Sequence, residues 1–210
     1  MRDALRVAAA GVLMMAVQGC SRRVLTPPRI DLKPHEVVGV IDFDCDGGGE
    51  FGPFLMDRFV EAVRCDQGMV RILRLGSAPD VLRAVNRSQL DRDAYQAIGG
   101  HFEVKTIFTG RLTASDVRPS ISTGRALTTI DVSADVDAML AVEMVEAETG
   151  ASLWSTSASD TQRIGGLRFF GDKSFTFDAD DPENAYGRLV DGLVHAVTQD
   201  FRSRWVRVKK

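Results

Sequence analysis

Few aromatic residues, few cysteines and the absence of a long apolar run each exclude a class of protein. Aromatic residues make up 7% of the 210 residues, and the three cysteines form neither a Cys-x-x-Cys pair nor a cluster with histidine. The sequence therefore predicts neither a zinc knuckle nor a disulfide framework. No run of about 18 or more apolar residues occurs, so no membrane-spanning helix is predicted.

The charge of the chain is close to balance. It has 26 basic and 29 acidic residues, for a net charge of −3. A general nucleic-acid binder carries a basic surface, so nucleic acid is not predicted as a partner. With 44% hydrophobic and 26% charged residues, the composition is that of a globular domain and excludes collagen, coiled-coil rods and wholesale disorder.

An apolar segment near the N-terminus has the form of an export signal. Arg2 and Arg6 precede residues 7–17, which are apolar and uncharged. This length suits a signal-peptide core and is too short for a stable membrane span. The pattern predicts export of the chain, by a lipoprotein signal or by an ordinary secretory one.

The sequence that follows the apolar segment resembles the lipobox of bacterial lipoproteins. Residues 17–20 read Val-Gln-Gly-Cys, with an aliphatic residue three positions before the cysteine and a small residue just before it. The resemblance implies that residues 1–19 are a lipoprotein signal peptide and that Cys20 carries the lipid, including a palmitate-type acyl chain. A residue other than Asp after the cysteine, here Ser21, implies anchoring in the outer membrane with the domain facing the periplasm.

Residues 20–35 are expected to form an extended tether between the lipid and the domain. This segment is basic, rich in proline and without periodicity. Residues 36–210 are then expected to form a single domain, because a chain of this length fits one core.

The pattern of residues 36–112 alternates between strands and helices. Residues 37–43 are almost all apolar and β-branched, which is typical of a strand buried on both faces. A glycine-rich turn and a helix beginning near Pro53 follow. Further segments are predicted as strands at 70–75 and 104–112, a helix from Ser77, and a helix over 91–98 that ends at Gly99 and Gly100.

The second half of the chain predicts a long antiparallel hairpin and a final helix. Apolar residues occupy every second position from Ile130 to Met144, and residues 151–162 are predicted to return as the partner strand. Asp181 and Pro182 then begin an amphipathic helix. The fold class predicted is α/β, with a mixed sheet that opens with βα units, a long antiparallel hairpin and a C-terminal helix packed on the sheet.

Motifs that would carry chemistry are weak. Glycines at 47, 49 and 52 match G-x-G-x-x-G, but Asp42, Asp44 and Asp46 precede them and would repel a phosphate. The same aspartates open a calcium-loop pattern whose closing position holds proline. The sequence therefore predicts no catalytic residue, no metal ligand and no cofactor.

Two further side-chain predictions concern cysteine and histidine. Cys45 and Cys65 are expected to lie at opposite ends of a helix, too far apart for a disulfide, and are predicted to be two buried thiols. His195 is predicted to be a partly exposed helical residue and not a catalytic base.

The order of these elements resembles the curli-secretion (CsgG-type) lipoprotein superfamily, which includes the lipoprotein activators of penicillin-binding proteins. The similarity rests on residues 37–44 with the glycine-rich turn and helix after them, on 104–110, on 141–150 with 153–155, and on the closing helix. The resemblance implies a membrane-tethered, periplasm-facing domain that works by protein contacts and is not an enzyme.

A phenylalanine-rich hairpin is the predicted partner-binding site. It contains Phe169, Phe170, Phe175 and Phe177 in a chain otherwise poor in aromatics. The expected function is that of an adaptor in envelope assembly, with a peptidoglycan synthase or a secretion component as its partner. Two alternatives stay open, an oligomeric secretion subunit and an enzyme or cation-binding protein that uses the aspartates at 42, 44 and 46. The basic residues Arg202, Arg204, Arg207, Lys209 and Lys210 are expected to end the last helix in solvent, with a contact to lipid headgroups as the less favoured alternative.

Overall fold

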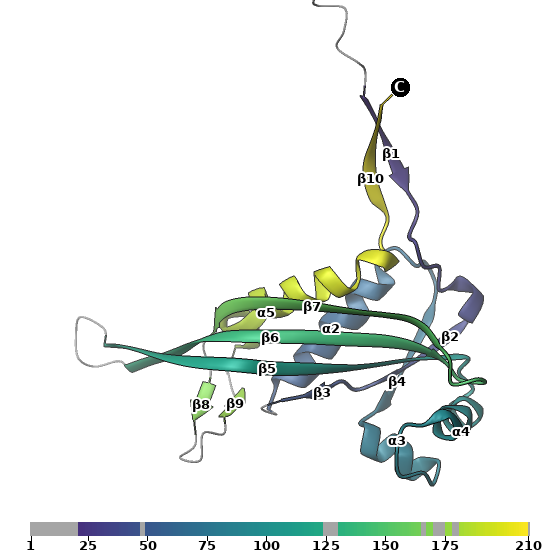
Figure 1. Ribbon diagram of the computed structural model, residues 1–210, viewed down its shortest axis with the longest axis horizontal. Coiled ribbons are helices and arrows are strands. Elements are labelled where there is room, and N and C mark those ends of the chain that lie inside the picture. Colours follow the sequence, from purple (N-terminus) through teal and green to yellow (C-terminus); the bar gives the residue numbers. More distant parts are fainter. Residues whose placement is uncertain are drawn as a thin grey trace, which may run out of the picture. The chain divides into compact units, whose positions relative to one another are not determined.

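The structure is a computed structural model that describes residues 21–46, 49–123, 130–164, 167–169, 175–177 and 181–209 (Figure 1). The chain divides into two compact units, residues 29–202 and residues 1–28 with 203–210. Each is described by itself. Among the described helices, none is long and apolar enough to cross a membrane.

A mixed six-stranded sheet organises residues 29–202. Its order is β4-β2-β5-β6-β7, with the short β3 paired to β5. β2 runs parallel to β4 and β5, whereas β5, β6 and β7 are antiparallel. The strands are β2 (Val37–Ile41), β3 (Asp44–Cys45), β4 (Arg71–Gly76), β5 (Thr106–Thr123), β6 (Ile130–Glu146) and β7 (Ser152–Ile164). The predicted α/β class, the opening βα units and the long hairpin are confirmed.

Four described α-helices accompany the sheet. They are α2 (Phe51–Arg64), α3 (Ala78–Ala84), α4 (Arg92–Phe102) and α5 (Pro182–Val197), with short 3₁₀ helices η2 (Lys33–His35) and η3 (Gln199–Phe201). α5 begins as the sequence predicts, because the Asp181 side chain accepts a hydrogen bond from the Asn184 backbone N–H. Its apolar face is buried.

The two faces of the sheet are covered to different extents. The even-numbered residues 134–144 of β6 are buried in the main core, together with apolar residues of α2 and α5. On the other face a smaller core joins Ile98 of α4 and Val81 of α3 to Ile107 of β5. Figure 1 shows α3 and α4 at one end of the long strands only. The rest of that face carries no described helix.

Helix α4 does not end at Gly99 and Gly100 as predicted. It continues to Phe102 and is terminated by Glu103, which adopts the left-handed conformation at φ 55°. A Cβ atom at Gly99 would lie 2.6 Å from the Cβ of Ala147. Gly99 is therefore required by close packing of the helix against the end of β6, and not by helix termination.

The second unit is a two-stranded antiparallel ribbon, which corrects the prediction of a helix terminus for residues 204–209. β1 (Ser21–Thr26) pairs along its whole length with β10 (Arg204–Lys209). Residues 204–209 were expected to end the last helix and form a strand instead, whereas residues 21–26, part of the expected extended tether, are extended. Both segments contain arginine together with β-branched or aromatic residues, which favours strands once a partner strand is available.

The two described cysteines are free, as predicted, but only one is shielded. Cys45 is partly buried, whereas Cys65 is exposed. The prediction of a buried thiol at Cys65 is wrong because α2 ends at Arg64, so Cys65 is the exposed residue that follows the helix.

Candidate functional site

Two of the five residues predicted from sequence as sites lie outside the described part of the structure. Cys20 and Phe170 are not among the described residues. Phe169 ends β8 (Leu167–Phe169), and Phe175 and Phe177 belong to β9 (Phe175–Phe177), which pairs with β8 as a hairpin. The predicted hairpin is therefore present, but its phenylalanine side chains are not described.

The aspartates after β2 are engaged by arginines. The Oδ1 of Asp42 lies 3.3 Å from the Nη2 of Arg74, and the Oδ2 of Asp44 lies 3.5 Å from the Nε of Arg111. Burial, together with the negative field of the neighbouring aspartates, raises the pKa of the Cys45 thiol from 9.0 to about 12. Within the described residues, no three carboxylate, histidine or cysteine side chains come together as a possible metal site.

His195 is exposed on α5, as predicted, and its Nδ1 lies 3.1 Å from the Nη1 of Arg202. Arginine can only donate, so His195 Nδ1 accepts this hydrogen bond. The two residues line a hollow of about 340 Å³ between α2 and α5, together with Arg58 and Cys65. Arg58 forms ion pairs with Glu183, Glu61 and Asp191. The charge of Arg58 and the ring of His195 therefore have partners within the protein, whereas the buried Nε atoms of Arg58 and Arg202 have no hydrogen-bond partner among the described residues.

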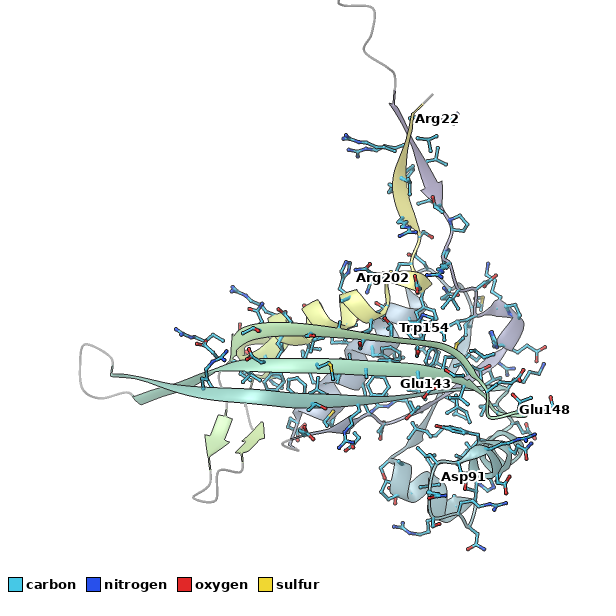
Figure 2. The ribbon with its side chains drawn as sticks, in the orientation of Figure 1. Arg22, Asp91, Glu143, Glu148, Trp154 and Arg202 are labelled. Carbon is cyan, nitrogen blue, oxygen red and sulfur yellow. The ribbon has the colours of Figure 1, made fainter. Side chains whose placement is uncertain are left out.

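One accessible feature of the described part of residues 29–202 is the part of the sheet that α3 and α4 leave uncovered, which we name the open sheet face. It consists of the outward positions of β5, β6 and β7 beyond α3 and α4. Glu143 of β6, labelled in Figure 2, lies where this face begins. The residues of the open sheet face are Thr109, Arg111, Arg118, Asp135, Asp137, Met139, Ala141, Glu143, Ser155, Ser157, Ser159, Thr161 and Arg163.

Small hydroxyl side chains line the outer strand of this face. Ser155, Ser157, Ser159 and Thr161 occupy alternate positions of β7 and are exposed. Their small size leaves a shallow hollow of about 570 Å³ over Thr109, Gly110, Arg111, Ala141, Val142, Glu143, Ser155, Thr156 and Ser157. This lining contains hydroxyls, one guanidinium and one carboxylate, and no histidine or thiol. The arrangement favours recognition by hydrogen bonds and charge.

Cross-strand ion pairs fix the far part of the open sheet face. Arg163 contacts both carboxylate oxygens of Asp135 at 3.0 and 3.2 Å, and Arg118 contacts both oxygens of Asp137 at 3.0 Å. The hydrogen bond from Arg163 lowers the pKa of Asp135. A hydrogen bond from Thr161, followed by that from Arg118, lowers the pKa of Asp137. Both aspartates therefore stay ionised at neutral pH, and the face presents fixed charges of both signs.

Sequence reasoning missed the open sheet face, although part of its signal was available. The alternation of serine and threonine from 155 to 161 predicts one small, polar face of a strand. The extent of uncovered sheet depends on where α3 and α4 pack, which no local pattern indicates.

Comparisons with known proteins give similarities of fold only. No family model matches the sequence, and no curated protein matches it. Among solved structures, the chain is similar to a PelC dodecamer from Paraburkholderia phytofirmans, at 12% identity over 88% of this chain and 100% of that chain, with a TM-score of 0.47. It is also similar to Lipoprotein GNA1162 from Neisseria meningitidis, at 16% identity over 60% and 83% of the two chains, with a TM-score of 0.37. The LpoB C-terminal domain from Escherichia coli is 12% identical over 61% and 84%, with a TM-score of 0.35. At these identities and TM-scores, function has to be argued from the chain's own residues.

Proposed function

We propose that this chain is a lipid-anchored protein of the bacterial cell envelope whose α/β domain acts by binding another envelope protein and not by catalysis. The observation that carries the binding role is the open sheet face, a broad polar surface whose hydroxyls and cross-strand ion pairs are held in place. The finer proposal is an outer-membrane adaptor facing the periplasm, with a peptidoglycan synthase or a secretion component as partner.

The anchor is supported by the order of features at the start of the chain. The chain begins with an apolar segment that leads into a Val-Gln-Gly-Cys sequence. Regular structure follows directly, because β1 begins at Ser21. Each methylene of an acyl chain buried in a bilayer contributes about 0.8 kcal/mol. Two or more acyl chains on Cys20 would therefore hold the protein on the membrane without a spanning helix.

The binding role is supported by the chemistry of the open sheet face. Non-obligate protein interfaces are polar and hydrated, and carry about one hydrogen bond per 100–200 Å². The serines of β7 offer such hydrogen bonds, and the Arg163–Asp135 pair offers charge that is already held in place. Binding of a partner here costs little conformational entropy, because these side chains are already ordered. The phenylalanine hairpin at 167–177 remains a second proposed contact.

The anchor is tested by metabolic labelling with radioactive palmitate in cells. The expected result is a labelled protein that is extracted with membranes, and a Cys20→Ser protein that is unlabelled and released from them. Ser21→Ala keeps the lipobox and serves as the matched control. A Cys20→Ser protein that is still labelled and membrane-bound would contradict the anchor.

The binding role is tested by placing a photo-cross-linking amino acid at Ser157 or Met139 of the lipidated protein. Both positions lie on the open sheet face and are exposed. The expected product is one discrete band that contains a different envelope protein, identified by mass spectrometry. The same amino acid at Arg83, an exposed position of α3, is the control and should give no such band.

Two other outcomes have defined meanings. A ladder of the protein with itself from position 157 would contradict the adaptor role and favour the oligomeric secretion subunit. A discrete partner captured equally from positions 157 and 83 would show that the open sheet face is not the site.

A further inference from the structure

The ribbon formed by β1 and β10 differs in charge from the rest of the folded chain. Residues 21–28 and 203–210 contain six basic residues, Arg22, Arg23, Arg204, Arg207, Lys209 and Lys210, and no acidic residue. Residues 29–202 contain 18 basic and 28 acidic residues, for a net charge of −10. The positive charge is therefore concentrated in the ribbon, although the whole chain is slightly acidic.

The same ribbon exposes large apolar side chains. Trp205 is 67% exposed, Leu25 and Val208 are each 50% exposed, and Val24 and Val206 are 42% and 40% exposed. These five are more than half of the nine exposed large hydrophobic side chains in the described chain. Such a concentration on a short ribbon indicates a surface that meets an apolar medium.

The strand register brings like residues together. Leu25 lies directly opposite Trp205, and Arg23 lies directly opposite Arg207. Residues directly opposite on antiparallel strands share a face, so the apolar pair and the arginine pair are neighbours on one side of the ribbon. Two like charges placed opposite each other destabilise the pairing. None of the ribbon's arginines takes part in an ion pair among the described residues.

We propose that the β1–β10 ribbon is a membrane-contact element that lies in the headgroup region of an anionic lipid surface. Its arginines bind lipid phosphates, while Trp205 and Leu25 enter the boundary with the acyl chains. Tryptophan prefers this depth because its ring is apolar and its N–H is polar. The proposal rests on the proposed function in one respect, because Cys20 brings Ser21 to the membrane.

The observations favour lipid over two other occupants. Pairing with a second copy of the ribbon would bring twelve positive charges together, six from each copy, without a counter-charge in either ribbon. Nucleic acid would satisfy the arginines, but it would not explain the exposed valines, and the export signal directs the chain away from it. Because residues 29–202 are acidic, the chain as a whole has no general attraction for anionic lipid. Binding should therefore depend on the ribbon.

The test uses the mature chain, residues 20–210, with Cys20→Ser so that no acyl chain contributes. All the described elements begin at or after Ser21, so this chain keeps the whole described fold. It is titrated with vesicles of phosphatidylcholine alone and with vesicles of phosphatidylcholine and phosphatidylglycerol, followed by co-sedimentation and by tryptophan fluorescence. The expected result is partition onto the anionic vesicles only, with a blue shift of the emission.

The variants separate the ribbon from the rest of the chain. Each ribbon arginine changed to glutamine should weaken partition about fivefold, because a basic residue near an anionic surface contributes about 1 kcal/mol. The Trp205→Phe variant should lose the blue shift, since the remaining Trp154 is partly buried and donates a hydrogen bond to Asp200. Arg83→Gln, an exposed arginine of α3, is the matched control and should bind like the parent.

Several outcomes would overturn the proposal. The first is that the protein does not partition onto anionic vesicles. The second is that Arg83→Gln weakens this partition as much as Arg207→Gln does. Another is a ribbon variant that changes the sedimentation mass of the protein without changing its partition. Failure of palmitate labelling at Cys20 would instead contradict only the anchor, because the vesicle experiment contains no acylated protein.

Discussion

Two adjacent glycines of α4 should respond in opposite directions to the same substitution. A Cβ atom added at Gly100 would lie in open space, with no atom within 4 Å apart from the adjoining backbone of its own helix. At Gly99 that Cβ would lie 2.6 Å from the Cβ of Ala147 and 3.1 Å from the carbonyl oxygen of Val104. Both residues are helical, so their intrinsic helix propensity is similar and only their surroundings differ.

The magnitudes follow from these contacts. Alanine stabilises a helix interior over glycine by about 0.5–1 kcal/mol, which is the full expected effect of Gly100→Ala. At Gly99 this gain is opposed by overpacking, which costs typically about 1–3 kcal/mol when backbone or side chains must shift. One kcal/mol moves the Tm of a chain of this length by about 2–4 °C. We therefore expect a higher Tm for Gly100→Ala and a lower Tm for Gly99→Ala.

The assay is thermal unfolding of the Cys20→Ser mature chain, followed by circular dichroism, with urea unfolding as a second measure. The double variant Gly99→Ala/Ala147→Gly removes the clashing methyl group and should recover part of the lost stability. If Gly99→Ala were as stable as Gly100→Ala, the packing of α4 against the end of β6 would be refuted, and with it our account of why this helix continues past residue 98.

Three further predictions concern single side chains. The side chain of Gln67 is buried; its Nε2 donates hydrogen bonds to two backbone carbonyls, and its Oε1 accepts one from a backbone N–H. Gln67→Ala should therefore lower the free energy of unfolding in urea by about 3 kcal/mol. A decrease below about 0.5 kcal/mol would contradict the contribution of these hydrogen bonds. The exposed Cys65 should react rapidly with a thiol reagent, and the partly buried Cys45 should react slowly. Because folding raises the pKa of Cys45 from 9.0 to about 12, the stability that the protonated Cys45 thiol contributes is present below pH 9 and is lost as the pH rises toward 12. Between pH 9 and pH 12 the Cys45→Ala variant should therefore lose less stability than the parent, as urea unfolding at several pH values would measure. Asp181→Ala should cost about 1 kcal/mol through loss of the α5 cap, whereas Asp181→Asn should cost little.

Local patterns predicted the elements whose burial is periodic. The alternation in β6 and the Asp181–Pro182 start of α5 are fixed by residues close together in sequence, so both were predicted correctly. The Gly99–Gly100 pair was misread because a glycine needed for close packing looks the same in sequence as one that ends a helix. Burial of Cys65 was misjudged because it depends on the residue at which α2 ends.

The missed features depend on contacts between distant segments. Neither residues 21–26 nor residues 204–209 form a strand on local evidence alone, because each is short, and its partner lies at the other end of the described chain. The open sheet face was missed for a related reason. The polar side of β6 is visible in sequence, but α3 and α4 cover only part of it.

The pairing of Ser21 with Lys209 also has a consequence for the order in which the chain can fold during its synthesis. Synthesis begins at the N-terminus, so β1 is available long before β10. During that interval Val24 and Leu25 lie on a strand with no partner, which is the state most prone to wrong pairing. The ribbon can close only when residue 209 is present, so its formation is a late event that depends on the whole chain. A chain that stops before residue 204 would keep the elements of residues 29–202 but leave β1 without its partner strand.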